Sequence, residues 1–233
     1  MKKIFIAIGV SLFFFIYIAG QASARPIACW DLNSNHECDP LEDINKDGNC
    51  NPRDCDVVEE SCYGVPKTGQ TTSYGTGDDG ALEKGLPWPD PRFTDNEDGT
   101  VTDNLTGLIW LKAAYCAGDK TWADALTFCN TLASGSCDLS DGSLVGEWRL
   151  PNIRELTSLI HYGFSPTLPN TAGTGPWTDG DPFTNVQVYW YWSSTSSVDS
   201  PPNNAWHVNM ASGDVLPADK GNGLPVWAVR DAK

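Results

Sequence analysis

The stretch WRLPNIRELTSLI, from Trp148 to Ile160, decides much of the fold. Pro151 suits the first turn of a helix, because its ring presets the backbone angle and its missing N–H would be unpaired there anyway. We expect this helix to bury four apolar side chains that recur at helical spacing, namely Ile153, Leu156, Leu159 and Ile160. Arg149 and Glu155 are expected to form a structural ion pair rather than part of an active site.

Another helix is predicted upstream of this stretch. The hydroxyl of Thr121 can cap it, and Asp124, three residues on, completes the capping pattern. Its apolar positions also recur at helical spacing: Trp122, Leu126, Cys129 and Leu132. Short strands bounded by turn residues flank the two helices, at residues 100–102, 108–111, 189–193, 205–210 and 226–230. Strands, two helices and further strands indicate an α+β fold.

The N-terminus has the pattern of an export signal. Lys2 and Lys3 precede an apolar run over residues 4–19, and small residues at 22–24 suit cleavage before Arg25. The alternative is an uncleaved membrane anchor, because the apolar run is slightly long. We expect residues 1–24 to be a signal peptide and the mature protein to be periplasmic, on the cell surface or secreted, with no membrane span.

Eight cysteines in an exported chain are expected to form disulfides. Five lie in the first mature segment (Cys29, Cys38, Cys50, Cys55 and Cys62) and three in the middle of the chain (Cys116, Cys129 and Cys137). Both groups are odd in number. Either one bridge joins the two regions, or two thiols stay free.

The formal net charge of the chain is −15, and loss of the two signal-peptide lysines makes the mature protein more acidic still. An acidic surface repels nucleic acid and sulfated polymers, whereas it attracts divalent cations and basic partners. Nucleic acid is therefore excluded as a partner.

Residues 25–62 contain a tandem repeat, in which the segment 31–42 is followed directly by 43–54. Both copies place oxygen-bearing side chains at the spacing of a calcium-binding loop. The predicted calcium ligands are Asp31, Asn33, Asn35, Glu37, Asp39 and Glu42 in the first copy, and Asp43, Asn45, Asp47, Asn49, Asn51 and Asp54 in the second. Gly48 provides the glycine that favours the sharp turn at the sixth position of such loops. His36 stands at this position in the first copy and departs from the pattern.

No helix fits between two loops that touch, so these are not EF-hands. The repeat resembles instead the helix-poor, disulfide-pinned calcium repeats of thrombospondin type 3 modules. Residues 25–62 have few large apolar side chains, so calcium and cystines would replace a hydrophobic core there. Residues 63–90 are rich in Gly, Pro, Thr and Ser and are interpreted as a linker or lead-in to the main domain at residues 91–233.

Several ordered sequence blocks of the main domain are similar to one family. They are RFTD at 92–95 with DGTVTD at 98–103, TGLIW at 106–110, TWADAL at 121–126, WRLPN at 148–152 with Glu155 and Leu156, YWSST at 191–195, and the closing Val229 and Arg230. Over roughly residues 67–231 the chain resembles the Lcl C-terminal domain family. The resemblance implies a C-type-lectin-like fold in an extracellular adhesion or glycan-binding module, sometimes trimeric. Trp227 stands in the last strand where the resemblance leads us to expect a more polar residue. We expect this difference to affect the surface there.

Two properties of the wider group do not carry over. The sugar-binding triplets of calcium-dependent lectins (Glu-Pro-Asn, Gln-Pro-Asp and Trp-Asn-Asp) do not occur in this sequence, and the main domain is acidic, which disfavours sulfated glycans. A binding protein for a glycan or surface protein, which could be a homo-oligomer, is the preferred interpretation. A structural envelope or appendage component is the alternative, and a cysteine-dependent oxidoreductase on a lectin-like fold is less favoured. We therefore expect no enzymatic activity.

The expected ligand contacts lie in the second half of the main domain. Alternation along the strand places Tyr189 and Tyr191 on the face opposite Trp192, and we expect His207 and Asn209 to lie near these tyrosines. Aromatic rings beside hydrogen-bonding groups suit a sugar. The alternative is that a loop such as residues 163–183 covers the rings.

The tandem repeat predicts calcium binding by the oxidised mature protein. Isothermal calorimetry should detect binding that Asp31→Ala and Asp43→Ala each weaken, because each change removes the first carboxylate of one loop. Calcium should also raise the thermal stability, and chelation should lower it. No binding heat, together with a melting temperature that is indifferent to chelator, would exclude the site.

Overall fold

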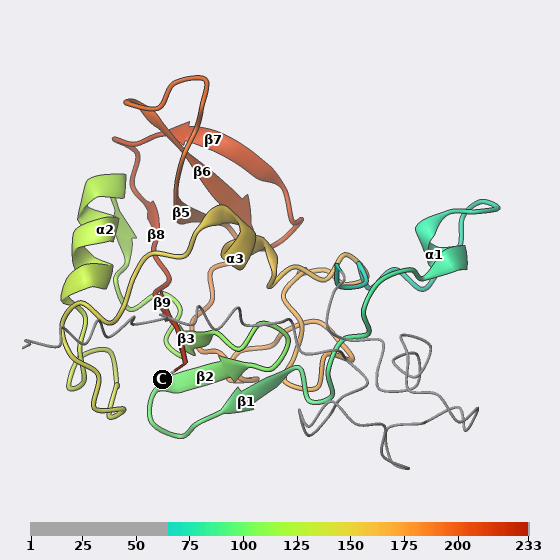
Figure 1. Ribbon diagram of the computed structural model, residues 1–233, viewed down its shortest axis with the longest axis horizontal. Coiled ribbons are helices and arrows are strands. Elements are labelled where there is room, and N and C mark those ends of the chain that lie inside the picture. The colour runs from blue at the N-terminus through green and yellow to red at the C-terminus, as the bar shows by residue number, and fades with distance from the viewer. Residues whose placement is uncertain (1–64, 233) are drawn as a thin grey trace, which may run out of the picture. The chain divides into compact units, whose positions relative to one another are not determined.

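The computed structural model describes residues 65–232, so the predicted signal peptide, calcium loops and first five cysteines lie outside the described residues. The described chain has two larger antiparallel sheets and one short strand pair (Figure 1). The four-stranded sheet has the order β1 (Phe93–Asp95), β2 (Thr100–Asp103), β3 (Ile109–Leu111) and β9 (Val229–Arg230). The three-stranded sheet consists of β5 (Trp190–Ser196), β6 (Asn204–Asn209) and β7 (Val215–Asp219). The short pair joins β4 (Asp119–Lys120) and β8 (Leu224–Pro225).

Within residues 65–232, three helices accompany these sheets: α1 (Asp79–Leu82), α2 (Trp122–Thr131) and α3 (Ile153–Thr157). The predicted cap of α2 is confirmed, since the Thr121 hydroxyl accepts from the Asp124 N–H at 3.3 Å. Strands before and after α2 and α3 confirm the α+β fold. None of the helices in residues 65–232 has the length and apolar character needed to cross a bilayer.

The start and length of α3 differ from the prediction. The helix begins at Ile153, so Pro151 lies before its first turn, and Asn152 caps it: the Asn152 side chain accepts from the N–H groups of Arg154 and Glu155 while Glu155 accepts from the Asn152 N–H. The helix ends at Thr157, before two of its predicted apolar positions. Leu159 and Ile160 are nevertheless buried, so the apolar pattern marks the core correctly although the helix is shorter.

Four tryptophans form the centre of the core: Trp110, Trp148, Trp192 and Trp227 are completely buried. Trp227 was expected to affect the surface of the domain, and this expectation is wrong because the residue is buried. Its ring packs against Phe183, with the centroids 4.8 Å apart, and its indole N–H donates to the Leu111 carbonyl at 2.7 Å. The hydrogen bond allows this large ring to be buried without an unpaired donor.

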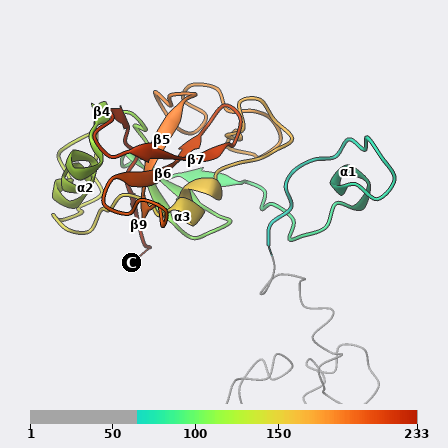
Figure 2. The ribbon, with the colours of Figure 1, turned by 90° about the horizontal axis from the view of Figure 1, so that it is seen from above.

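Residues 65–92 form a lead-in that leaves the domain, carries α1 at its tip and returns (Figure 2). Its base is held by hydrogen bonds, because the Lys67 N–H donates to the Leu86 carbonyl at 2.9 Å and the Tyr162 N–H donates to the Thr68 carbonyl at 2.8 Å. The described part of the predicted linker or lead-in is therefore joined to the domain at its base.

Three arginines of the family-like blocks form ion pairs within the domain. Arg92 and Asp103 are both completely buried, and Arg92 Nη2 lies 3.0 Å from Asp103 Oδ2. The predicted pair of Arg149 with Glu155 is confirmed at 2.6 Å. Arg230 pairs with Asp141 at 3.1 Å.

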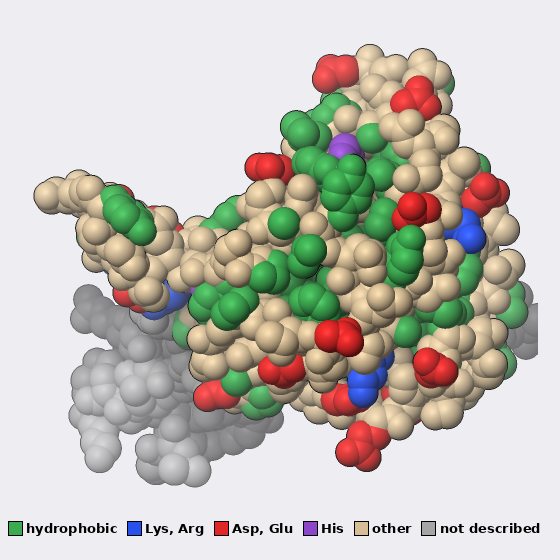
Figure 3. Space-filling view, turned by 180° about the vertical axis from the view of Figure 1, so that it is seen from behind, with side chains coloured by type: hydrophobic (Ala, Val, Ile, Leu, Met, Phe, Trp, Pro, Cys, Tyr) green, Lys and Arg blue, Asp and Glu red, His purple; other side chains and the backbone are tan. Residues whose placement is uncertain are grey.

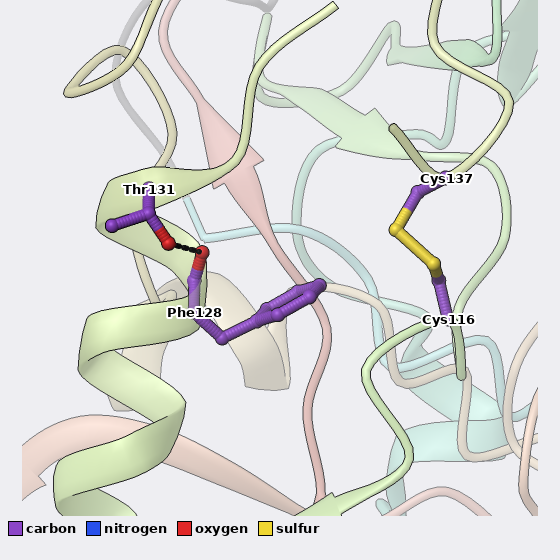
Figure 4. The surroundings of a disulfide bond; sticks show 4 residues. All are labelled: Cys116, Phe128, Thr131 and Cys137. Carbon is purple, nitrogen blue, oxygen red and sulfur yellow. Dashed lines mark hydrogen bonds between the residues drawn. A yellow bond between two sulfur atoms is a disulfide. The ribbon is translucent and has the colours of Figure 1, made fainter. Parts of the chain in front are cut away.

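One of the expected disulfides joins Cys116, after β3, to Cys137, after α2 (Figure 4). Cys129 lies between them in the chain, on α2, where it is buried and free. Burial raises the pKa of the Cys129 thiol to about 12. The first five cysteines lie outside the described residues, so the two alternatives for the odd groups stay open.

The buried Arg92–Asp103 pair gives a test of the fold. Arg92→Met leaves the Asp103 carboxylate buried without its partner, so we expect a loss of about 3–5 kcal/mol in the free energy of unfolding. The double variant Arg92→Met/Asp103→Leu should lose less than the two single variants together. Lys112→Met, which breaks the half-exposed pair with Asp95, serves as the control and should cost under about 1 kcal/mol. Urea denaturation measures all four; a stable Arg92→Met protein would refute the assigned role.

Cys129 gives a second test. In the native protein it should resist thiol reagents, because burial blocks access and keeps the sulfur protonated. After denaturation without reductant, at most two thiols should react, and Cys129→Ala should remove one of them. Mass spectrometry counts the labels. Rapid labelling of native Cys129, or more than two thiols after denaturation, would contradict the assignment.

Candidate functional site

The predicted ligand residues lie on or beside the three-stranded sheet, but the sheet separates them. In the register of β5 with β6, Trp190 is opposite Asn209, Tyr191 is opposite Val208, and Trp192 is opposite His207. Directly opposed side chains share a face of an antiparallel sheet. His207 and Asn209 therefore lie on the face of Trp190 and Trp192, and Tyr191 lies on the other face. Grouping Tyr191 with His207 was wrong.

Tyr191 is also completely buried, so the expectation that its ring faces a ligand is wrong. Its ring centroid lies 5.5 Å from that of Trp227, and its hydroxyl accepts from the Gln187 N–H at 2.8 Å. Burial raises the pKa of the Tyr191 hydroxyl above its ordinary value. The residue stabilises the core beneath the sheet.

The opposite face, here called the tryptophan face, consists of Trp190, Trp192, His207, Asn209 and Leu216, which the register of the three strands brings together. Trp192 is buried, Trp190 is half-buried, and Leu216 is 50% exposed. In the rear view, hydrophobic side chains gather around a histidine over the upper part of the domain (Figure 3).

His207 is the polar centre of the tryptophan face. Its ring centroid lies 4.2 Å from that of Trp190 and 5.9 Å from that of Trp192. Burial lowers the pKa of His207 below its ordinary value, so the ring is neutral at pH 7. Its Nδ1 atom has no hydrogen-bond partner among the described residues. The face is therefore aromatic and carries no positive charge from its histidine.

Of the remaining two predicted contacts, Asn209 lies on this face and Tyr189 immediately precedes β5 in the chain. Tyr189 precedes β5 and is 56% exposed. Asn209 is half-buried, and its side-chain oxygen accepts from the Ala211 N–H at 2.8 Å. The Tyr189 side chain is thus accessible to a ligand, whereas the Asn209 side chain already forms a hydrogen bond in the turn between β6 and β7.

A cavity that the sequence did not indicate lies between the lead-in and residues 161–174. Its volume is about 400 Å³, and its lining includes Lys67, Asp79, Glu83, Trp88, His161 and Phe164. The composition of residues 63–90 suggested a linker or lead-in, and His161 stood alone in the sequence. Only folding brings the two segments together. No spacing pattern in the sequence indicates this cavity, because its lining comes from two distant segments.

The predicted calcium ligands, residues 31–54, all lie outside the described residues. Within residues 65–232 there is no group of three or more side chains arranged to hold a metal ion. The calcium prediction therefore rests on the sequence repeat alone.

Comparison with known proteins addresses the domain as a whole. No curated protein matches the chain. The sequence profile of the Lcl C-terminal domain matches residues 99–230, which cover β2 through β9 together with α2 and α3. This match spans more than half of the sequence. The chain belongs to the Lcl C-terminal domain family.

Proposed function

We propose that this is an exported bacterial binding protein whose Lcl C-terminal domain, C-type-lectin-like in fold, recognises a glycan on the tryptophan face. The observation that carries the proposal is the half-buried Trp190 beside the neutral His207, with the exposed Tyr189 next in the chain. Aromatic rings present flat apolar surfaces that suit the C–H faces of sugars, and their polar edges suit the hydroxyls.

The electrostatics favour an uncharged glycan over a sulfated one. Recognition of sulfate needs exposed arginine or lysine side chains. In this domain Arg92, Arg149 and Arg230 all form ion pairs with its own carboxylates. The chain as a whole carries a formal net charge of −15. A polyanionic ligand would therefore meet net repulsion.

The N-terminal segment has a separate proposed role. Residues 25–62 bind calcium through the tandem loops and, with their cystines, form a module like the thrombospondin type 3 repeat. Such a module needs an oxidising, calcium-containing environment, which agrees with a location in the periplasm, on the cell surface or outside the cell.

A structural role in the envelope or in an appendage is the second candidate. It is favoured by exposed apolar side chains, since Leu216 on the tryptophan face and Val188, just before β5, are each 50% exposed. Such side chains suit contact with a surface protein or with another copy of the chain. This candidate predicts self-association or protein binding without any glycan.

A glycan array with neutral and sulfated sugars, run with and without calcium, tests the proposal. Neutral glycans should bind, and Tyr189→Ala and Trp190→Ala should each weaken binding about tenfold, equivalent to about 1.4 kcal/mol. Tyr74→Ala removes an exposed tyrosine of the lead-in and is the matched control, which should bind normally. Preference for sulfated glycans, or normal binding by folded Tyr189→Ala and Trp190→Ala variants, would refute the site. Concentration-dependent self-association without glycan binding would support the structural role.

A further inference from the structure

The cavity beneath the lead-in has an aromatic wall of three rings. The rings of His161 and Phe164 are stacked, with centroids 3.9 Å apart and planes 7° from parallel. The edge of Trp88 meets His161, with centroids 4.8 Å apart. Hydrogen bonds fix two of the rings, because Trp88 Nε1 donates to the Lys67 carbonyl at 2.7 Å and His161 Nδ1 accepts from the Gly163 N–H at 3.3 Å. The wall is preformed.

The lead-in fits closely against this wall. Gly69 has a φ of +88°, and a Cβ atom placed there would lie 2.1 Å from His161 Cε1. Only glycine allows the backbone to approach the ring in this way. The position of the lead-in, and with it the opposite wall of the cavity, therefore depends on the aromatic stack.

The opposite wall carries two carboxylates and one ammonium group. Asp79 begins α1 and accepts a hydrogen bond from the Thr68 hydroxyl, and Glu83 caps the end of α1. Lys67 Nζ lies 3.5 Å from Glu83 Oε2, with both side chains partly exposed. A partly exposed pair is weak and keeps both groups accessible to water. The two acids therefore outnumber the single lysine.

The two basic side chains in contact with Trp88, Arg92 and His161, do not compensate for this excess negative charge. Arg92 lies behind Trp88, with its guanidinium carbon 4.7 Å from the ring centroid, but it is completely buried and paired with Asp103. Burial and the charge of Arg92 lower the pKa of His161 below its ordinary value, so His161 is neutral at pH 7. A negative rim beside neutral rings attracts a cation.

We propose that this cavity binds an organic ammonium group, with Asp79 and Glu83 balancing its charge while Trp88, His161 and Phe164 contact the carbon groups that carry it. Carboxylates supply charge-assisted acceptors for N–H donors, and aromatic rings add cation–π attraction. The ammonium can belong to an amino sugar or to a lysine side chain. This site shares no residue with the tryptophan face. More than half of its lining residues lie before residue 99, outside the part matched by the family.

The test uses matched pairs of probes on the oxidised mature protein, followed by calorimetry and saturation-transfer NMR. Glucosamine is compared with glucose, and Nα-acetyl-lysine amide with Nα-acetyl-norleucine amide. At least one ammonium probe should bind ten times more tightly than its uncharged counterpart, and added salt should weaken this binding. Preference for glucosamine alone identifies a sugar source, and preference for the lysine probe alone identifies a protein source.

Conservative variants assign the binding to the cavity. Asp79→Asn and Glu83→Gln keep the shape and the hydrogen-bond acceptor while removing the charge, and each should weaken ammonium binding about fivefold to tenfold. Asp199→Asn, at an exposed acid remote in sequence from the cavity lining, is the matched control and should bind as the parent does. Equal binding of charged and uncharged probes overturns the proposal. The proposal is also overturned if Asp79→Asn and Glu83→Gln both fold and both bind ammonium probes as the parent does. Neither result bears on glycan binding by the tryptophan face, because Tyr189→Ala reports on that site.

Discussion

The buried ion pair of Arg92 and Asp103 is the constraint on which the rest of the domain depends. Arg92 also donates to the Ser158 carbonyl at 3.1 Å, just after α3, and Asp103 accepts from the N–H groups of Leu105 and Thr106 in the turn before β3. Two buried charges are costly unless such bonds satisfy them. The pair therefore holds the end of the lead-in, the first hairpin and α3 in one arrangement, and Trp88 is positioned by stacking on Arg92.

The predictions that held depend on residues close together in the chain. The cap at Thr121 and the pair of Arg149 with Glu155 are local patterns, because helical spacing or a single turn brings the partners together. The error at Tyr191 has a different origin. Alternation within one strand was read correctly, but the register between β5 and β6 is a contact between separate segments, and a shift by one residue changes which side chains share a face.

Composition did not show where the lead-in contacts the domain, for a similar reason. A segment rich in glycine, proline and threonine has the same composition whether it is a free linker or lies against a partner. Here the partner is the segment around His161 and Tyr162, far away in sequence. Trp227 shows the converse, because a tryptophan in a family position expected to be polar is accommodated once its N–H reaches the Leu111 carbonyl. Neither contact leaves a periodic signal in the sequence.

The placement of Cys129 between Cys116 and Cys137 has a consequence for the order of events during maturation. All three thiols emerge within one short stretch, so each could initially be oxidised with either neighbour. Once α2 packs on the core, Cys129 is withdrawn from oxidants, and only the correct pair stays reactive. Oxidation after α2 has packed would therefore favour the Cys116–Cys137 pair. A chain oxidised faster than α2 forms would be trapped in a mispaired state that only thiol exchange could release.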